Sequence, residues 1–490
     1  MYQGTRGGRP VVCRGCRAVW HRGGVSHIHV AGEIHADAAT RAPGWLSVPE
    51  DVNALLPRLW SAGVTKDRAG MLSVAGVSAA RLAEEVGTPA YVLDIADLRQ
   101  RARSFAAAFA GWQVYYAGKS FLCTAVARWV VAEGLGVDVC TGGELAVALR
   151  AGVDPARIGF HGNNKSEPEL RTALAAGVGR IIVDSFDEIA RLSRLAAESG
   201  ARPRVLVRVT TGVEAHTHEF IATAHEDQKF GFSIAGGQAA EALAACHADP
   251  ALELTGIHSH IGSQIFDSQG FDVAARRTLH LHAEFARKTG VELPELDLGG
   301  GFGIAYTSAD TPSTPQELAE ALRRIVRAEC AALGVAVPEM SVEPGRAISG
   351  PGAFALYRVG TVKTVLLDGG ASRRYVAVDG GMSDNIRTAL YGAEYSATLA
   401  SRRSAAPPVL ARVVGKHCEG GDILVRDEFL PADIAPGDLL AVPAAGAYSR
   451  SMASNYNHVP RPPVVGVADG AITTLIRRET LEDLLALDVS

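Results

Sequence analysis

The chain has 490 residues, of which 47% are hydrophobic and 21% are charged, and its formal net charge is −5. This balance is typical of a soluble globular protein with two or three domains, and it excludes the basic surface of a nucleic-acid-binding protein. No run of 18 apolar residues predicts a membrane span, and no signal peptide opens the chain, so we expect neither a membrane nor a nucleic acid as partner.

The N-terminal 44 residues predict a disordered extension, because they are rich in Gly and Arg and show no hydrophobic period. Cys13 and Cys16, followed by three histidines, form a weak zinc motif. No second ligand pair lies at finger-like spacing, so we expect no metal. The seven cysteines of the chain are scattered and odd in number. They indicate reduced thiols in a cytoplasmic protein rather than a disulfide framework.

The segment 45–94 predicts a short amphipathic helix at 51–60, a strand at 72–74, a helix at 78–86 and a strand at 89–94. Ser78 is a suitable N-cap and Gly87 a suitable stop for the second helix. Because an isolated pair of strands is only marginally stable, we expect these N-terminal strands to join the β domain that is predicted at the other end of the chain.

Strands and helices then alternate from residue 95 to residue 349. This pattern is typical of parallel strands joined by helical crossovers, and eight strands predict a closed (β/α)8 barrel of the TIM type, in the α/β class. The expected strands are 113–117, 136–139, 158–161, 180–183, 204–209, 254–259, 295–298 and 339–342. The expected helices are 95–109, 121–133, 143–151, 166–175, 186–198, 235–246, 271–289 and 315–332.

The pattern changes after residue 350, where strands follow one another without long helices. Segments 354–364, 374–378, 408–414, 438–442 and 471–474 predict a C-terminal antiparallel β-sandwich or barrel over 350–490, with a last short helix at 479–486.

Glycine-rich and charged clusters follow the predicted barrel strands, where active sites of such barrels lie. Lys119 follows the first strand; alone, it could simply cap that strand with a solvated charge. The run Gly299–Gly303 could be a flexible turn or a backbone cradle for phosphate, with Ser263 and the Gly345 amide as further donors. Together with Glu343 after the last strand, this set suits pyridoxal phosphate. The lysine amine would condense with its aldehyde, and the carboxylate would keep its ring nitrogen protonated.

The pair His258 and His260 has two interpretations. A His-x-His pair can bind a metal, but no carboxylate cluster is near in the sequence. We therefore expect His260 to lie over the cofactor ring, with His258 as its partner in the core.

Six segments carry a resemblance to a known family. They are YYAGKSF (115–121), DVCTGGELAVALRAG (138–152), GIHSHIGSQIFD (256–267), DLGGGFGIAY (297–306), EPGRAISGPG (343–352) and DGGMSDN (379–385). The chain resembles the pyridoxal-phosphate decarboxylases with an alanine-racemase-like barrel. Its C-terminal half resembles the diaminopimelate decarboxylases among them, over roughly residues 48–487.

The resemblance implies a role for each matching residue. Lys119 would bear the cofactor, His260 would stack on its ring and Glu343 would pair with its nitrogen. Ser263, Gly301 and Gly345 would hold the phosphate. Cofactor and substrate would both touch Arg346 and Tyr448. The substrate alone would contact Arg387, Tyr391 and Glu419, and Cys418 would be the catalytic proton donor.

The resemblance also implies a homodimer with shared active sites, in which the loop of Cys418 and Glu419 reaches the partner's barrel. The alternative to a catalytic role is that Cys418 is simply a small buried hydrophobic residue. The implied reaction is decarboxylation of meso-2,6-diaminoheptanedioate to L-lysine and CO₂, the last step of lysine biosynthesis. A decarboxylase of arginine, ornithine or carboxynorspermidine is the near alternative, and Arg387 argues against the simple diamine-forming members. An amino-acid racemase and a catalytically silent homologue are more distant ones.

Overall fold

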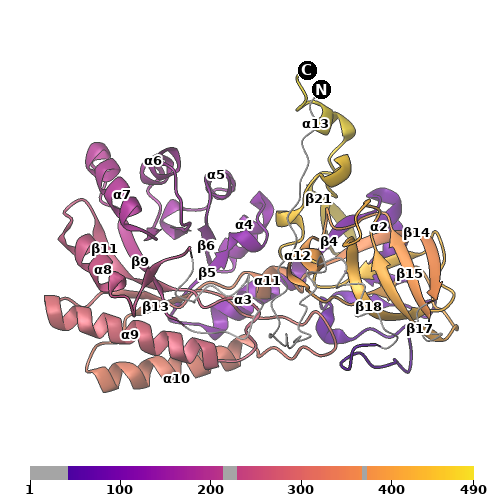
Figure 1. The fold of residues 1–490 in the computed structure, drawn as a ribbon, viewed down its shortest axis with the longest axis horizontal. Helices are drawn as coiled ribbons and strands as arrows, with labels where there is room; N and C mark the ends of the chain where they lie inside the picture. Colours follow the sequence, from indigo (N-terminus) through magenta and orange to yellow (C-terminus); the bar gives the residue numbers. More distant parts are fainter. Residues whose placement is uncertain (1–41, 213–228, 367–371) are drawn as a thin grey trace, which may run out of the picture.

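The structure is a computed structural model, and it describes residues 42–212, 229–366 and 372–490. A barrel of strands and helices and a β domain lie side by side (Figure 1). The expected extension 1–44 falls almost wholly outside the described residues, as do Cys13 and Cys16 with the zinc site weighed there.

Eight parallel strands form a closed barrel, as predicted. The ring closes because β13 pairs with β5 and β8 pairs with β9. A ninth, two-residue strand, β10 (Phe232–Ser233), pairs with β9 alone. The barrel strands are largely buried, as expected for parallel strands covered on both faces. They are β5 (Gln113–Ala117), β6 (Gly136–Val139), β7 (Ile158–Phe160), β8 (Arg180–Val183), β9 (Arg204–Thr210), β11 (Glu253–Ser259), β12 (Glu295–Asp297) and β13 (Glu339–Val342).

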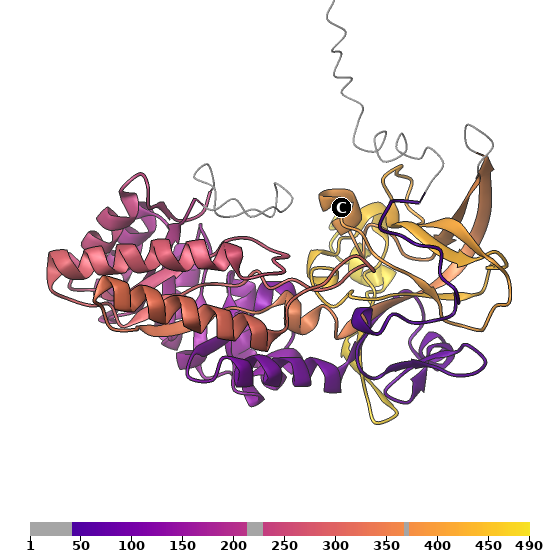
Figure 2. The same ribbon diagram turned by 90° about the horizontal axis from the view of Figure 1, so that it is seen from below.

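Helices surround the barrel, and the two longest, α9 and α10, lie alongside each other (Figure 2). Their ends follow the local sequence. Capping boxes at Ser166 and Thr314 start α6 and α10, and Gly200, Gly290 and Gly334 end α7, α9 and α10 in the left-handed region. The helices are α3 (Ile95–Ala108), α4 (Thr124–Ala132), α5 (Gly142–Arg150), α6 (Glu167–Ala176), α7 (Phe186–Ser199), α8 (Gln238–Ala248), α9 (Gln269–Thr289) and α10 (Pro315–Leu333).

The β domain is built on β14 (Ala353–Leu366), which pairs with β4, β15 and β19. The N-terminal strand β4 (Ala90–Asp94) lies between β14 and β20, so the predicted contribution of the N-terminal segment is confirmed. The sheet is mixed rather than wholly antiparallel, because β4 pairs with β20 and β15 with β17 in parallel. The other strands are β15 (Ser372–Val378), β16 (Thr398–Leu399), β17 (Pro408–Val414), β18 (Ile423–Pro431), β19 (Leu439–Val442), β20 (Val464–Ala468) and β21 (Ala471–Ile476).

Two predictions for the N-terminal segment are wrong. The helix at 51–60 is absent apart from one 3-10 turn, η1 (Pro57–Leu59), because proline disfavours helical backbone in the residue before it. The strand β2 (Leu72–Val74) does not join the large sheet. It pairs with β1 (Val64–Lys66) and β3 (Val77–Ser78) in a small sheet of its own, which packs its apolar side chains against the β domain. The helix that follows, α2 (Ala79–Glu85), is capped by Ser78 as predicted.

Three short helices complete the described chain: α11 (Arg346–Ser349), α12 (Arg387–Tyr391) and α13 (Leu481–Leu485). Among the described helices, none combines the length and the apolar character needed to cross a bilayer.

Candidate active site

Lys119 lies directly after β5, in the 3-10 turn η2 (Gly118–Ser120). Ser120 is buried, and its Oγ donates a hydrogen bond of 2.9 Å to the carbonyl of Ala117. Its own carbonyl oxygen accepts a hydrogen bond of 2.8 Å from the backbone N–H of Tyr448 in the β domain. Both domains therefore fix the turn that carries the lysine.

Two adjoining cavities, of about 790 and 650 Å³, open beside Lys119. Lys119, His260 and Glu343 line both of them. The first is also lined by Ser263, Gly301, Gly345, Arg346, Arg387, Tyr391 and Tyr448, all of which the sequence singled out. The second is lined by residues of several barrel strands and of the segments that follow them, among them Asp138, Cys140, Glu144, His161, Arg208 and His258.

Glycine is required on one wall of the first cavity. A Cβ atom at Gly300 would lie 2.3 Å from the carbonyl oxygen of Glu343, and one at Gly301 would lie 2.9 Å from that of Gly262. A Cβ at Gly345 would lie 2.9 Å from Ala117. Without side chains, this backbone can approach a ligand closely, and such amide-lined turns suit a phosphate. These residues thus fit the phosphate group of pyridoxal phosphate.

His260 lies between the cavities and is oriented by the same glycine run. Its Nδ1 accepts a hydrogen bond of 3.2 Å from the backbone N–H of Gly300. Burial, together with the nearby charges of Lys119 and Arg208, lowers the pKa of His260 well below its ordinary value. A neutral imidazole in this place can pack its face against a cofactor ring.

Two buried arginines line the first cavity, each held by a tyrosine. Arg346 donates to Tyr306 Oη at 2.6 Å, and Arg387 donates to Tyr395 Oη at 2.7 Å. The rings of these tyrosines meet edge to face, with centroids 4.9 Å apart. Arg346 also donates to Ser263 Oγ at 2.7 Å. The two guanidinium groups are thus fixed side by side.

The charges of the two arginines lower the pKa of Tyr306. Burial acts to raise the pKa of this phenol, but Arg346 and Arg387 outweigh it, so the pKa lies below its ordinary value. The pKa of Tyr395 is raised instead, because burial and the neighbouring Tyr306 outweigh Arg387 and Arg346. The two positive charges thus act on both phenols.

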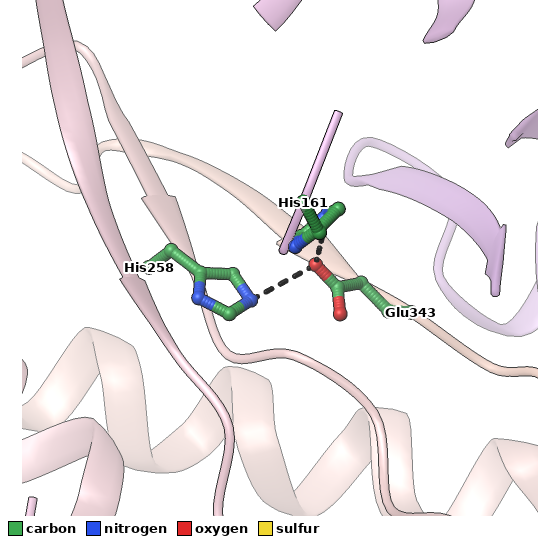
Figure 3. A group of neighbouring side chains, drawn as sticks. All are labelled: His161, His258 and Glu343. Atoms are coloured by element: carbon green, nitrogen blue, oxygen red, sulfur yellow. Dashed lines mark ion pairs between the residues drawn. The ribbon is translucent and has the colours of Figure 1, made fainter. Parts of the chain in front are cut away.

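At the base of the second cavity, Glu343 faces two imidazoles (Figure 3). Its Oε1 lies 3.0 Å from His258 Nε2 and 3.3 Å from His161 Nε2. Since Glu343 lines both cavities, its carboxylate can reach the nitrogen of a pyridine ring bound beside Lys119.

A buried charge network supports this carboxylate. Arg180 donates to Asp297 Oδ2 at 2.6 Å and to Ser341 Oγ at 3.0 Å. It also lies 4.0 Å from Glu343 and 3.9 Å from Asp138. Burial raises the pKa of Asp138 to about 7, against the opposing effect of Arg180. With Glu295, also 4.0 Å away, the network brings four carboxylates to one arginine in the barrel interior.

Cys418 and Glu419 are the two predicted residues that this chain does not bring to Lys119. Both are exposed, and neither lines either cavity. Their loop is nevertheless anchored: Asp422 accepts hydrogen bonds from the backbone N–H groups of Met382 at 2.6 Å and His417 at 2.7 Å. The thiol and the carboxylate are therefore presented at the surface by a fixed loop.

Several residues of the site were not singled out from the sequence. His161 directly follows β7, just as Glu343 directly follows β13, so its place could have identified it. Tyr306 closes the segment that begins at the glycine run. Tyr395 lies 8 positions after its partner Arg387, so its nearness in the sequence could have identified it. Arg180 carries no comparable signal, because contacts between distant segments bring it to the site.

Comparisons with known proteins agree with this geometry. A model of the family described as "Pyridoxal-dependent decarboxylase, pyridoxal binding domain" matches residues 95–350. The diaminopimelate decarboxylase of Mycobacterium tuberculosis (strain ATCC 25618 / H37Rv) is 56% identical over 440 residues, which cover 89% of this chain and 98% of that protein. The enzyme of that name from Bacillus subtilis is 46% identical over 424 residues, or 86% and 95% of the two chains.

Solved structures show the same likeness. The diaminopimelate decarboxylase of M. jannaschii in complex with L-lysine superposes with a TM-score of 0.81 at 29% identity, covering 88% of this chain and 98% of that one. The Helicobacter pylori enzyme complexed with L-lysine gives 0.75 at 29% identity, over 83% and 98%. With 56% and 46% identity over most of both chains and a fold in common with these structures, this chain belongs to the diaminopimelate decarboxylases, within the pyridoxal-dependent decarboxylases.

Proposed function

We propose that the protein decarboxylates meso-2,6-diaminoheptanedioate to L-lysine and CO₂. The observation that carries this proposal is one cavity that holds a strand-end lysine, a glycine cradle and two buried arginines. A substrate with a second amino-acid end explains the arginines, because their planar guanidinium groups suit a carboxylate. The relatives named above bear the name of this activity.

The cofactor of the family is pyridoxal 5′-phosphate, and the residues present fit it. Lys119 offers the amine, and the turns at Gly301 and Gly345 with Ser263 suit its phosphate. His260 would lie against its ring and Glu343 would pair with its nitrogen, since both side chains line the same cavities as Lys119. When bound, the cofactor accepts the electron pair that CO₂ leaves behind.

On the substrate, we assign the far carboxylate to Arg346 and Arg387, with Tyr391 and Tyr448 beside them. Glu419 would take the far ammonium group by charge pairing. Cys418 would deliver the proton that replaces CO₂, since an ordinary thiol is protonated at neutral pH. An exposed position suits that role only if another surface covers it.

The geometry of that loop leads us to propose a homodimer with shared sites. Cys418 and Glu419 of one subunit would complete the cavity of the other, because they lie outside the cavities of their own chain. We further propose that the enzyme works in the cytoplasm, which agrees with the free thiols of the described cysteines.

The test is product analysis with the cofactor-loaded protein. Wild type should release CO₂ and L-lysine from meso-2,6-diaminoheptanedioate, and absence of L-lysine would refute the proposal. Arginine, ornithine and carboxynorspermidine should be poor substrates because they lack the far amino-acid end. Loss of the optical rotation of a chiral amino-acid substrate, such as L-arginine, without release of CO₂ would indicate a racemase instead.

A Cys418→Ala variant tests the proton donor. We expect it to keep the cofactor absorbance and to lose most of its turnover, by about a hundredfold or more, as is usual for a general acid. Cys330→Ala is a matched control, because Cys330 is buried outside the site. Unchanged turnover in Cys418→Ala would move the proton-donor role to another residue.

A further inference from the structure

His161 and His258 both point at one oxygen of Glu343 (Figure 3). The three side chains are buried, with 8%, 1% and 7% of their residue surfaces exposed. They come from different places in the barrel: His161 follows β7, His258 lies in β11 and Glu343 follows β13. The ring centroids of the two histidines are 5.0 Å apart, in an edge-to-face arrangement.

Two imidazoles and a carboxylate have the composition of a metal site, and their ligand atoms lie within 4.8 Å of one another. The surroundings oppose a cation. An Nη atom of Arg180 lies 4.0 Å from Glu343 Oε1. A metal ion at the cluster would therefore face a guanidinium at short range, inside a barrel where water screens charge poorly. The position favours N–H donors to the carboxylate over a bound metal.

The protonation of His161 fits a donor role. Burial lowers the pKa of His161 well below its ordinary value, although Glu343 acts in the opposite direction. A neutral imidazole carries its proton on one nitrogen only. Its Nε2 lies 3.2 Å from Asp138 Oδ1 and 3.3 Å from Glu343 Oε1, so a proton on Nε2 has two carboxylates within reach. His258 directs its Nε2 to the same Glu343 oxygen.

We infer that His161 and His258 are positioning residues, which hold Oε1 of Glu343 and so direct its other oxygen at the ring nitrogen of the cofactor. Both Nε2 atoms lie within contact distance of Oε1, although neither contact has hydrogen-bond geometry in this structure, and a turn of the carboxylate would lose both contacts. The inference rests on the cofactor assigned in the proposed function, but not on which amino acid is decarboxylated. Neither histidine touches the reacting atoms.

Matched variants separate the N–H donor from the bulk of the side chain. Glutamine can place an amide N–H near the position of Nε2, whereas leucine has similar size and no donor. We would compare His258→Gln with His258→Leu, and His161→Gln with His161→Leu. His258→Asn, whose amide is too short to reach Oε1, serves if a leucine variant does not fold. The control is His282→Leu, because His282 is a buried histidine of α9 outside the site.

The direct readout is the nitrogen-15 chemical shift of the ring nitrogen in full-length protein loaded with labelled pyridoxal phosphate. Wild type, both glutamine variants and the His282→Leu control should show a protonated nitrogen. In the leucine and asparagine variants, the chemical shift should move toward that of an unprotonated nitrogen. The Glu343→Gln variant gives the reference shift for the unprotonated nitrogen. We also expect their cofactor affinity, from absorbance titration, and their kcat to fall about tenfold, the usual effect of losing a hydrogen bond to a charged group.

Three outcomes would overturn the inference. A protonated ring nitrogen in both leucine variants would show that Glu343 needs neither histidine. An equal loss in the glutamine and leucine variants would indicate packing rather than donation. A stoichiometric metal in wild type that the leucine variants lack would make the cluster a metal centre. Failure of wild type to form L-lysine would leave the shift measurement intact, so it would refute the proposed substrate without touching this inference.

Discussion

The first cavity is dominated by two buried guanidinium groups. Among the residues that the structure describes, no carboxylate forms an ion pair with Arg346 or Arg387. A buried charge without a counter-charge is costly. Hydrogen bonds to tyrosine hydroxyls stabilise the two buried charges in part, and an anionic ligand would stabilise them further. This is the strongest residue-level argument for a substrate that brings its own carboxylate.

Tyr306→Phe tests that argument. The variant keeps the aromatic ring but loses the hydroxyl that accepts a hydrogen bond from Arg346. We expect KM for meso-2,6-diaminoheptanedioate to rise about tenfold with kcat nearly unchanged, because the contact orients a binding group and not the reacting bond. Steady-state kinetics give both values. Tyr375→Phe, at a tyrosine of β15, is the control, and an equal KM in both variants would contradict the assignment.

Asp384 predicts a pH dependence of stability. Burial raises the pKa of this carboxyl to about 7, although the Gly381 N–H donates to it at 2.8 Å. Because the folded-state pKa lies above the unfolded value, its contribution to stability is fully present below the unfolded pKa and is lost as pH rises through about 7.

Asp384→Asn removes this titration with little change of shape. Between pH 5.5 and 8, we expect the free energy of unfolding of wild type to fall by about 2 kcal/mol relative to that of the variant. Urea unfolding of the full chain at several pH values measures it. The same substitution at the exposed Asp469 should leave the pH profile parallel to that of wild type. Parallel profiles for Asp384→Asn as well would show that this carboxyl does not titrate as described.

At the scale of elements, the turns that follow the barrel strands form the site. The turn after β5 carries Lys119, the turn after β12 carries the glycine run, and the turn after β13 carries Glu343 and Gly345. Since parallel strands end at the same rim, chemistry that is dispersed over more than 220 positions meets in one place.

Gly345→Ala tests the tight packing of these turns. Gly345 has a negative φ, so the new methyl group acts through its contacts with Ala117, at 2.9 Å, and with Ser120 Oγ, at 3.1 Å. We expect cofactor affinity to fall by at least about tenfold while the fold persists, because the wall that receives the phosphate must move. Absorbance titration of the apoprotein with pyridoxal phosphate measures the affinity. Gly143→Ala, in α5, meets nothing closer than 3.8 Å and should bind like wild type; equal affinities would argue against the cradle.

At the scale of the whole molecule, one chain does not bring all of the proposed active-site residues together. The barrel and the β domain together enclose Lys119 and the arginines, while Cys418 and Glu419 lie exposed on a fixed loop. The proposed dimer resolves this separation, because a two-fold axis gives each cavity the loop of the other subunit.

Mixing two inactive variants tests the shared site. Lys119→Ala and Cys418→Ala subunits should each be nearly inactive alone. After mixing and subunit exchange, half of the dimers are mixed and each of these has one intact site, so activity should recover to about a quarter of that of wild type. Activity assays with and without exchange measure it. Recovery near zero, with exchange verified by mass, would place both residues in the same chain's site.

The sequence by itself determined the repeated strands and helices of the barrel, their ends, and the rim residues that follow the strands. These features are local: apolar periodicity, caps and glycine turns act over a few residues. The sequence also determined the family, because six separated segments agree.

Only the tertiary structure decided where the short strands pair. The strand at 72–74 pairs within a small separate sheet. The sequence does not predict β18 and β20, because pairing with partner strands and not local preference defines them. The tertiary structure also decided that His161 and His258 meet at Glu343, that Tyr306 and Tyr395 hold the arginines, and that Cys418 faces outward. Apart from Arg387 and Tyr395, which are 8 positions apart, these contacts join residues 40 or more positions apart, so no local pattern encodes them.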